Sequence, residues 1–254
     1  MENRIKVILI AIIGMFVINS AYADNQEIFK TANKHYKAGN YENAIELYSK
    51  ILKTGEHSAE LYFNIGNANY KTANYPKAIL YYEKAKLLSP SDDDINLNLR
   101  IANQKIVDKI PVIEPFFLYS WVMSQVNMFD STAWAMAFLV HLSIVIIALA
   151  LKMFAVTPWK KRLYFGIACL FGLMALIGIS SAITRLNIEN AKDTAIVMTP
   201  VVDMKSGLDP TAETSFVLHE GTKVKILDTK DNWFKVKISD GREAWIPAKD
   251  VEVI

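Results

Sequence analysis

Two long uncharged stretches constrain this chain of 254 residues more than any other feature. Residues 132–151 and 163–184 contain no Asp, Glu, Lys or Arg. A helix that crosses the ~30 Å hydrocarbon core of a bilayer needs about 20 such residues, and it satisfies its own backbone hydrogen bonds there. We therefore predict a two-helix transmembrane hairpin in the lipid bilayer, with spans at 132–152 and 163–184.

The charges around these spans predict which side of the membrane each segment occupies. Four basic residues and no acidic residue lie between the two stretches: Lys152, Lys160, Lys161 and Arg162. Short loops rich in Lys and Arg stay in the cytoplasm. The loop at 153–162 is therefore predicted to be cytoplasmic. Residues 110–131 contain no Lys or Arg, which favours the opposite side for both flanking segments.

The first 23 residues have the three-part pattern of a secretory signal. Arg4 and Lys6 precede the apolar run 7–18, and Ala21 and Ala23 stand at the positions of a cleavage site. We predict a cleavable signal peptide at 1–23, with an uncleaved N-terminal anchor as the alternative. An exported N-terminus followed by two spans predicts a two-pass inner-membrane protein whose N- and C-terminal domains are periplasmic.

An internal repeat of 34 residues follows the signal sequence. Identical residues recur at this offset: Tyr41/Tyr75, Ala44/Ala78, Ile45/Ile79 and Tyr48/Tyr82. The second copy also has Gly66 where two helices would cross closely and Pro90 where the second helix would end. It resembles a tetratricopeptide repeat, which predicts all-α helical hairpins at 25–58 and 59–92. Because such hairpins need neighbours to bury their apolar faces, we predict a capping helix at 94–109 that completes a repeat domain at 24–109.

In tetratricopeptide arrays, the first helix of each hairpin faces a peptide-binding groove. The resemblance places eight residues on that face: Phe29, Asn33, Tyr36, Lys37, Phe63, Asn67, Tyr70 and Lys71. The paired asparagines and lysines could hydrogen-bond an extended peptide or its terminal carboxylate. The alternative interpretation is a solvated face on which these residues bind nothing.

Short β-branched runs separated by turn residues begin near residue 191. We predict five strands, at 195–198, 216–218, 223–227, 233–238 and 243–246, with a long loop at 199–215. The order of His219-Glu220-Gly221, Trp233-Phe234 and Ala244-Trp245-Ile246-Pro247 resembles a bacterial SH3 domain. The resemblance implies a small, closed, all-β SH3-like barrel at 190–254.

Trp233 and Trp245 are a candidate ligand face of this domain, because exposed aromatic side chains bind peptides or sugars well. Such tryptophans more often seal the core of the barrel, and we favour core packing. If the domain has a ligand, peptidoglycan or a protein surface is the expected one.

Three further features concern the membrane region. Residues 110–131 are rich in aromatic side chains, which favour the headgroup level of a bilayer. We predict an interfacial linker there, with an apolar helix packed on the spans as the alternative. His141 lies in the middle of the first span without an ionisable partner, so we expect a neutral histidine hydrogen-bonded between the helices; a functional proton site is the alternative. A stripe of small residues in the second span could pack on the first span or on another protein: Ala168, Gly172, Ala175 and Ala182.

Composition argues against several classes of function. The net charge of +2 gives no global field for nucleic acid. The single cysteine, Cys169, excludes an intramolecular disulfide and a cysteine zinc cluster, and the four histidines lie far apart in the sequence. We therefore expect no catalytic residues, no metal site and no cofactor, and we predict that the chain is not an enzyme.

The order of these parts resembles that of the BatE family of the Bacteroidetes aerotolerance (Bat) operon. The resemblance implies an envelope complex with the operon's von Willebrand A-domain membrane proteins and a MoxR-type ATPase. The sequence thus predicts a multidomain membrane protein. The leading hypothesis is an adaptor that assembles an aerotolerance or stress-related complex, and the alternative is a wall sensor that binds peptidoglycan through the SH3-like domain.

Overall fold

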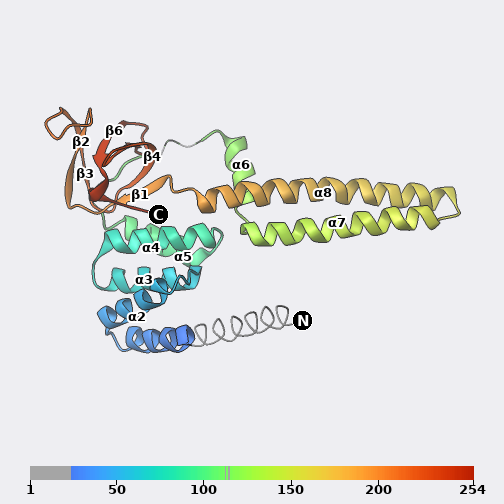
Figure 1. The fold of residues 1–254 in the computed structure, drawn as a ribbon, viewed down its shortest axis with the longest axis horizontal. Coiled ribbons are helices and arrows are strands. Elements are labelled where there is room, and N and C mark those ends of the chain that lie inside the picture. Colours follow the sequence, from blue (N-terminus) through green and yellow to red (C-terminus); the bar gives the residue numbers. More distant parts are fainter. Residues whose placement is uncertain (1–23, 112, 114) are drawn as a thin grey trace, which may run out of the picture.

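The computed structural model describes residues 24–111, 113 and 115–254. The predicted signal peptide at 1–23 lies outside these residues. A stack of short helices and a C-terminal β-sheet lie together at one end of a long helical hairpin, which extends away from both (Figure 1).

The N-terminal region is a stack of antiparallel helices. A helix at 24–37 is followed by α2 (Tyr41–Lys53), α3 (Ala59–Lys71), α4 (Tyr75–Leu88) and α5 (Asp93–Asn103). The side chains of Ser58, Asn74 and Asp92 accept hydrogen bonds from N–H groups at the start of α3, α4 and α5, respectively. These polar N-caps fix where the three helices begin.

The two helical hairpins contain the same contacts, 34 residues apart. In each, a tyrosine of the second helix donates its hydroxyl to an asparagine of the first helix and packs on a phenylalanine. These triplets are Tyr48, Asn33 and Phe29, and Tyr82, Asn67 and Phe63. A Cβ atom on Gly66 would lie 2.6 Å from the ring of Tyr82, so the close crossing of α3 and α4 requires glycine. The 34-residue repeat therefore preserves the contacts inside the hairpins as well as the identity of the residues.

Helix α5 ends at Asn103, whereas the predicted capping helix extended to residue 109. The chain turns toward the sheet because two side chains beyond the helix make contacts there. Asp108 accepts hydrogen bonds from His219 and Thr222, and Ile106 packs on a core that contains residues of both the helices and the sheet. These contacts stabilise the turn in place of further helix.

Helices α7 (Ser131–Phe154) and α8 (Pro158–Asn190) form the long hairpin, and both are long and apolar enough to cross a membrane. Small residues of α8 are buried, namely Ala168, Ala175, Gly178, Ser181 and Ala182. A Cβ atom on Gly178 would lie 3.4 Å from the backbone of Phe138 in α7. Gly172 lies on the same face by helical spacing, but a Cβ atom there would meet nothing within 4 Å among the described residues, so this position of the stripe does not contact α7.

The prediction that His141 is hydrogen-bonded between the two helices is wrong, because its ring bonds within its own helix. Its Nδ1 lies 2.6 Å from the carbonyl oxygen of Ala137, one turn earlier in the same helix. Its ring packs against Phe171 of α8, with centroids 5.7 Å apart. The local carbonyl takes the hydrogen bond because α8 is apolar around this position.

Helix α6 (Phe117–Val126) precedes the hairpin and lies beside α8 at the end nearest the sheet (Figure 1). Five aromatic or apolar side chains here are more than half exposed: Phe116, Phe117, Leu118, Tyr119 and Trp121. Most of the apolar surface of α6 is therefore not packed on the part of the chain that the structure describes.

The C-terminal region is a seven-stranded antiparallel sheet in the order β3-β2-β6-β5-β4-β1-β7. The strands are β1 (Thr194–Val197), β2 (Val201–Lys205), β3 (Thr214–His219), β4 (Lys223–Lys230), β5 (Trp233–Lys237), β6 (Glu243–Pro247) and β7 (Val251–Val253). A short 3-10 helix, η1 (Ala248–Asp250), precedes β7. Alternating side chains fill one core, among them Met204, Leu218, Val236 and Ile246.

Two features of this sheet differ from the predicted five-stranded closed barrel. Strand β2 lies in the stretch that was predicted to be a loop, where Val202 and Met204 alternate with more exposed residues. Strand β7 has three residues, too few for a clear alternation. The sheet order has two edges, β3 and β7, and no strand pairing among the described residues joins them. A closed barrel is therefore not confirmed.

Candidate functional site

The first candidate site is a hollow on the repeat region. It has a volume of about 280 Å³ and is lined by Tyr36, Asn67, Tyr70, Lys71, Tyr82, Asn98 and Ile101. Four of the eight predicted groove residues, Tyr36, Asn67, Tyr70 and Lys71, therefore lie around one space. The hollow is polar and faces solvent, as a peptide groove would.

Internal hydrogen bonds fix which atoms of the central asparagine face the hollow. Oδ1 of Asn67 accepts from the hydroxyl of Tyr82 at 2.8 Å and from Nδ2 of Asn98 at 2.9 Å. Its Nδ2 group has no hydrogen-bond partner among the described residues. An amide whose oxygen is used internally presents its two N–H donors outward, so Asn67 offers donors and not acceptors.

Asn33 is held in the same way in the first hairpin, since its Oδ1 accepts from the hydroxyl of Tyr48. Burial raises the pKa of Tyr48 to about 12, with smaller contributions from Tyr36 and Glu60. Burial likewise raises the pKa of Tyr82. Both hydroxyls therefore stay protonated at neutral pH, and both asparagines keep this orientation.

The other predicted groove residues have different roles. Phe29 and Phe63 pack on the rings of Tyr48 and Tyr82 inside the hairpins. Lys37 is exposed in the last turn of the first helix but does not line the hollow. Asn98 of α5 was missed, because it lies on the helix that was treated only as a cap.

The tryptophans of the sheet lie outside its core, contrary to the favoured interpretation. Trp233 and Trp245 are half-buried. The residues at alternate positions of the same two strands form or contact the core, namely Phe234, Val236, Ala244 and Ile246. Alternation along a strand therefore turns both tryptophans to the other face. Trp233 lines a groove of about 710 Å³ together with Pro210, Asn232 and Pro247. Trp245 lies opposite Lys205 and Lys235 in the sheet register.

A shared apolar core joins the repeat region to the sheet. Ile196 of β1 is fully buried in a cluster with Ile79 and Leu80 of α4 and Leu99 of α5. Gly221, at the turn before β4, has φ +88°, and a Cβ atom there would overlap Ile106. The two modules therefore pack as one unit.

Asp108 reinforces this junction with three hydrogen bonds. Its carboxylate accepts from the backbone N–H of His219 at 2.7 Å, from Oγ1 of Thr222 at 2.7 Å, and pairs with Nδ1 of His219 at 2.8 Å. Partial burial acts to raise the pKa of Asp108, but these hydrogen bonds outweigh it and lower the pKa below 3.8. The carboxylate is therefore charged at neutral pH.

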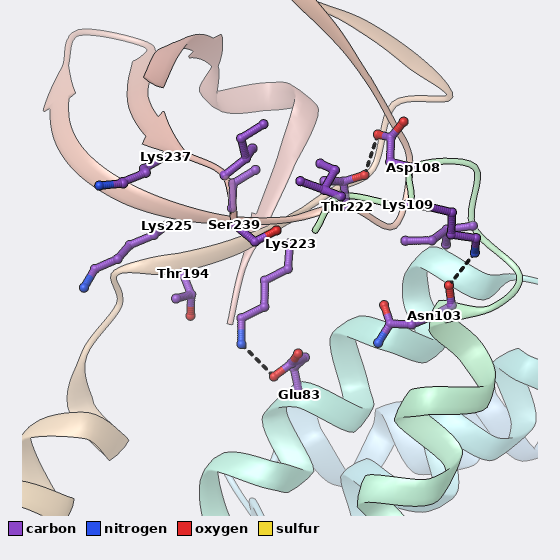
Figure 2. A pocket seen from close by; sticks show the side chains of 14 residues that line it. Glu83, Asn103, Asp108, Lys109, Thr194, Thr222, Lys223, Lys225, Lys237 and Ser239 are labelled. Carbon is purple, nitrogen blue, oxygen red and sulfur yellow. Dashed lines mark hydrogen bonds and ion pairs between the residues drawn. The ribbon is translucent and has the colours of Figure 1, made fainter. Parts of the chain in front are cut away.

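A cavity of about 610 Å³ lies beside this junction (Figure 2). Apolar side chains and four lysines line it: Ile106, Ile110, Val224, Ile238, Lys109, Lys223, Lys225 and Lys237. Lys223 pairs with Glu83 of α4 at 2.8 Å across the cavity, and Lys109 donates to the carbonyl of Asn103 at 2.8 Å.

A buried arginine attaches the hairpin to the repeat region. Arg185 of α8 is 2% exposed. Its guanidinium donates to the carbonyl of Leu87 at 2.6 Å and to Oδ1 of Asn127 at 3.0 Å, and it pairs with Glu189 at 3.2 Å. Glu189 also accepts from the backbone N–H of Ser131 at 3.1 Å. The network thus joins α4, the segment after α6 and both helices of the hairpin.

No group of three or more His, Cys, Asp or Glu residues in the described part of the chain is arranged to hold a metal ion. The hydrogen-bonded clusters around Asn67, Asp108 and Arg185 instead join helices and strands to one another.

Two family models match parts of the chain. Residues 59–92 match the tetratricopeptide repeat, and residues 206–252 match the bacterial SH3 domain. No curated protein matches the chain. The first match coincides with the second predicted repeat, and the second begins after β2 in the structure. The chain therefore contains a tetratricopeptide repeat and a bacterial SH3 domain, which are typically non-catalytic interaction modules.

Proposed function

We propose that this chain is a non-enzymatic scaffold of the inner membrane, which holds envelope proteins through the repeat groove. The observation that carries this proposal is the donor-lined hollow between the repeat helices. Asn67 is fixed there with its amide nitrogen outward, and Lys71 lies beside it.

The hairpin supports insertion into a bilayer with both modules in the periplasm. The repeat region and the sheet join the same end of the α7–α8 hairpin (Figure 1). Lys152, Lys160, Lys161 and Arg162 lie at its opposite end. A basic turn of this kind stays in the cytoplasm. The exposed aromatic residues of α6 would then rest at the headgroup level of the periplasmic side.

The chemistry of the groove favours an extended peptide segment that offers carbonyl or carboxylate oxygens. Asn67 and Lys71, one turn apart, supply an amide donor and a cation in the hollow. Asn33 and Lys37 repeat this pair one hairpin earlier, outside the hollow itself. By the family resemblance, the partners are the von Willebrand A-domain proteins of the Bat operon, and the complex serves aerotolerance.

Two substitutions test the groove without removing its internal hydrogen bonds. Asn67→Asp keeps an oxygen for Tyr82 and Asn98 but replaces the outward donor with a negative charge, and Lys71→Gln removes the cation. A hydrogen bond to a charged group contributes about 1.5–3 kcal/mol, so each variant is expected to capture membrane partners roughly tenfold less well. The measurement is crosslinking in intact membranes followed by quantitative mass spectrometry.

Lys77→Gln is the matched control, because Lys77 is exposed in the first turn of α4 and does not line the hollow. This variant should recover the same partners as the wild type. If Asn67→Asp, Lys71→Gln and Lys77→Gln all recovered the same amount of crosslinked partners, the groove would not be the binding site.

A second candidate function is peptidoglycan binding through the SH3 domain. The groove beside Trp233 favours it, since a half-buried tryptophan that lines a groove of about 710 Å³ can stack on a sugar or a peptide. The test is co-sedimentation of the detergent-solubilised full chain with cell-wall sacculi. Sedimentation that Trp233→Ala abolishes would support this function, and absence of sedimentation at low salt would exclude it.

A further inference from the structure

Two lysines lie directly opposite each other on the exposed face of the sheet. Lys225 of β4 pairs in register with Lys237 of β5, and on its other side with Thr194 of β1. The three residues therefore form a row across three adjacent strands, about 4.8 Å from one strand to the next. Like charges in directly opposite positions destabilise a sheet, so a further anion between the two lysines would be favourable.

The surrounding carboxylates leave a positive excess at this row. Lys223 is paired with Glu83 at 2.8 Å, and Lys225 lies 3.6 Å from Asp193, a pair that is about half exposed. Glu243 of β6 lies opposite Lys237 in the register, but its carboxylate pairs with Lys235 at 2.9 Å, and no carboxylate of the described residues lies within ion-pair distance of Lys237. Asp108, the other carboxylate that lines the cavity, is already hydrogen-bonded to His219 and Thr222.

The row lies close to the end of the hairpin. Thr194 follows α8 by four positions, because α8 ends at Asn190. Figure 2 shows the side chains of Lys225 and Lys237 extending in the same direction, toward the side on which the end of α8 lies. The uncharged part of α8 ends at Thr184, so residues 185–190 extend about 9 Å beyond it at 1.5 Å per residue. This length is comparable to the headgroup layer of a bilayer.

The orientation of the sheet relative to the hairpin is fixed by contacts already described. Arg185 attaches α8 to the repeat region, and Asp108 and Ile196 attach the repeat region to the sheet. The lysine row is therefore held toward the level of the headgroups and does not swing freely on a linker.

We propose that Lys225 and Lys237 bind the phosphate of an anionic phospholipid headgroup, with the hydroxyl of Thr194 beside them. The inference rests on the proposed membrane insertion with both modules on one side. A phosphate between the two ammonium groups relieves their repulsion, and the lipid becomes a second attachment of the SH3 domain to the bilayer surface.

The test is native mass spectrometry of the full chain in a neutral detergent, titrated with phosphatidylglycerol or with phosphatidylcholine. A lysine near an anionic surface contributes roughly a fivefold factor in affinity. We therefore expect the wild type to bind phosphatidylglycerol at least about tenfold more tightly than phosphatidylcholine, and Lys225→Gln/Lys237→Gln to bind both within about twofold of each other. Thermal unfolding without anionic lipid should be unchanged or slightly higher in this variant, because the like-charge pair is gone.

Lys34→Gln/Lys77→Gln removes the same charge from exposed positions of the repeat helices and serves as the control. It should keep the wild-type preference. Equal affinity of the wild type for both lipids, or an equal loss in both double variants, would overturn the proposal. Glycerol 3-phosphate distinguishes a lipid site from a site for soluble phosphates. If it displaced phosphatidylglycerol at the concentration at which the lipid itself binds, the proposal of a lipid site would also be overturned.

These outcomes are independent of the groove. Lys225→Gln/Lys237→Gln should capture protein partners like the wild type, and Asn67→Asp should keep the lipid preference. A failure of the lipid site is therefore distinguishable from a failure of the scaffold function.

Discussion

Arg185 shows how a single side chain can attach a long apolar hairpin to a folded module. Its guanidinium has acceptors from three segments around it, and one of them is the carbonyl of Leu87 near the C-terminal end of α4. A cation is favoured at that end of a helix by the helix dipole. Burial makes the network costly to break, because removal of one partner leaves the other charge buried and unpaired.

Arg185→Met is therefore expected to destabilise the chain by about 3 kcal/mol, because Glu189 loses its buried partner. Arg185→Lys should fall between this variant and the wild type, since one ammonium group cannot reproduce the planar set of donors. Thermal unfolding in detergent measures both. If Arg185→Met unfolded at the wild-type temperature, the network would not be the attachment that we describe.

The hydrogen bonds of Asp108 predict how the junction responds to acid. Its pKa is lowered in the folded state relative to 3.8. The stabilisation is therefore complete above about pH 4 and is lost as the pH falls through the lowered value. Asp108→Asn should be less stable than the wild type at pH 7, and this difference should shrink below pH 4. Urea unfolding at each pH measures this difference in the free energy of unfolding. A difference that stayed constant from pH 7 to pH 3 would contradict this role.

At the scale of elements, the turn before β4 fixes the sheet to the repeat helices. Gly221→Ala should cost about 1–2 kcal/mol for the left-handed backbone and a further 1–3 kcal/mol, roughly, for the overlap with Ile106. Gly241→Ala is the control, because Gly241 also has positive φ but a Cβ atom there would lie at an ordinary 3.4 Å from Ile113. The measurement is the free energy of unfolding. Ile106→Ala should recover part of the loss in Gly221→Ala, and equal costs at both glycines would show that the junction is not tightly packed.

The packing of α7 on α8 makes a similar paired prediction. Gly178→Leu should separate the helices, because even a Cβ atom there would contact the backbone of Phe138, whereas Gly172→Leu faces open space. Cysteines introduced at facing positions of α7 and α8 should form a disulfide in the Gly172→Leu background and much less in Gly178→Leu. Equal crosslinking would place the helix contact elsewhere.

The elements that could be predicted from sequence are those whose signal is local. The two apolar helices follow from the length of their uncharged stretches, and the second repeat follows from the 34-residue periodicity. Strand β2 was missed because its inward side chains, Val202 and Met204, lie among turn residues. The extension of α5 to residue 109 was wrong because Asp108 and Ile106 bind a sheet that lies about half the chain away.

The candidate sites were harder to predict for the same reason. The groove residues Asn67 and Lys71 follow from the repeat pattern, but the orientation of Asn67 depends on Asn98 in another helix. The partner of Arg185 in the repeat region lies 98 positions earlier, and that of Asp108 in the sheet lies 111 positions later. No spacing within a short window contains these pairs, so only the three-dimensional structure reveals them.

At the scale of the whole molecule, two interaction modules pack as one unit at one end of the α7–α8 hairpin. The repeat region presents the donor-lined hollow, and the sheet presents a tryptophan groove and a lysine row. All of these surfaces are useful to envelope partners only if both modules lie on the periplasmic side.

Cysteine labelling of intact bacterial spheroplasts tests this topology most directly. The single native cysteine is replaced by Cys169→Ala, and one exposed cysteine at a time is introduced by Lys77→Cys, Val156→Cys or Ser206→Cys. We expect a membrane-impermeant maleimide to label Lys77→Cys and Ser206→Cys before lysis, and Val156→Cys only after it. Labelling of Val156→Cys in intact spheroplasts, with the two module positions protected until lysis, would contradict the account.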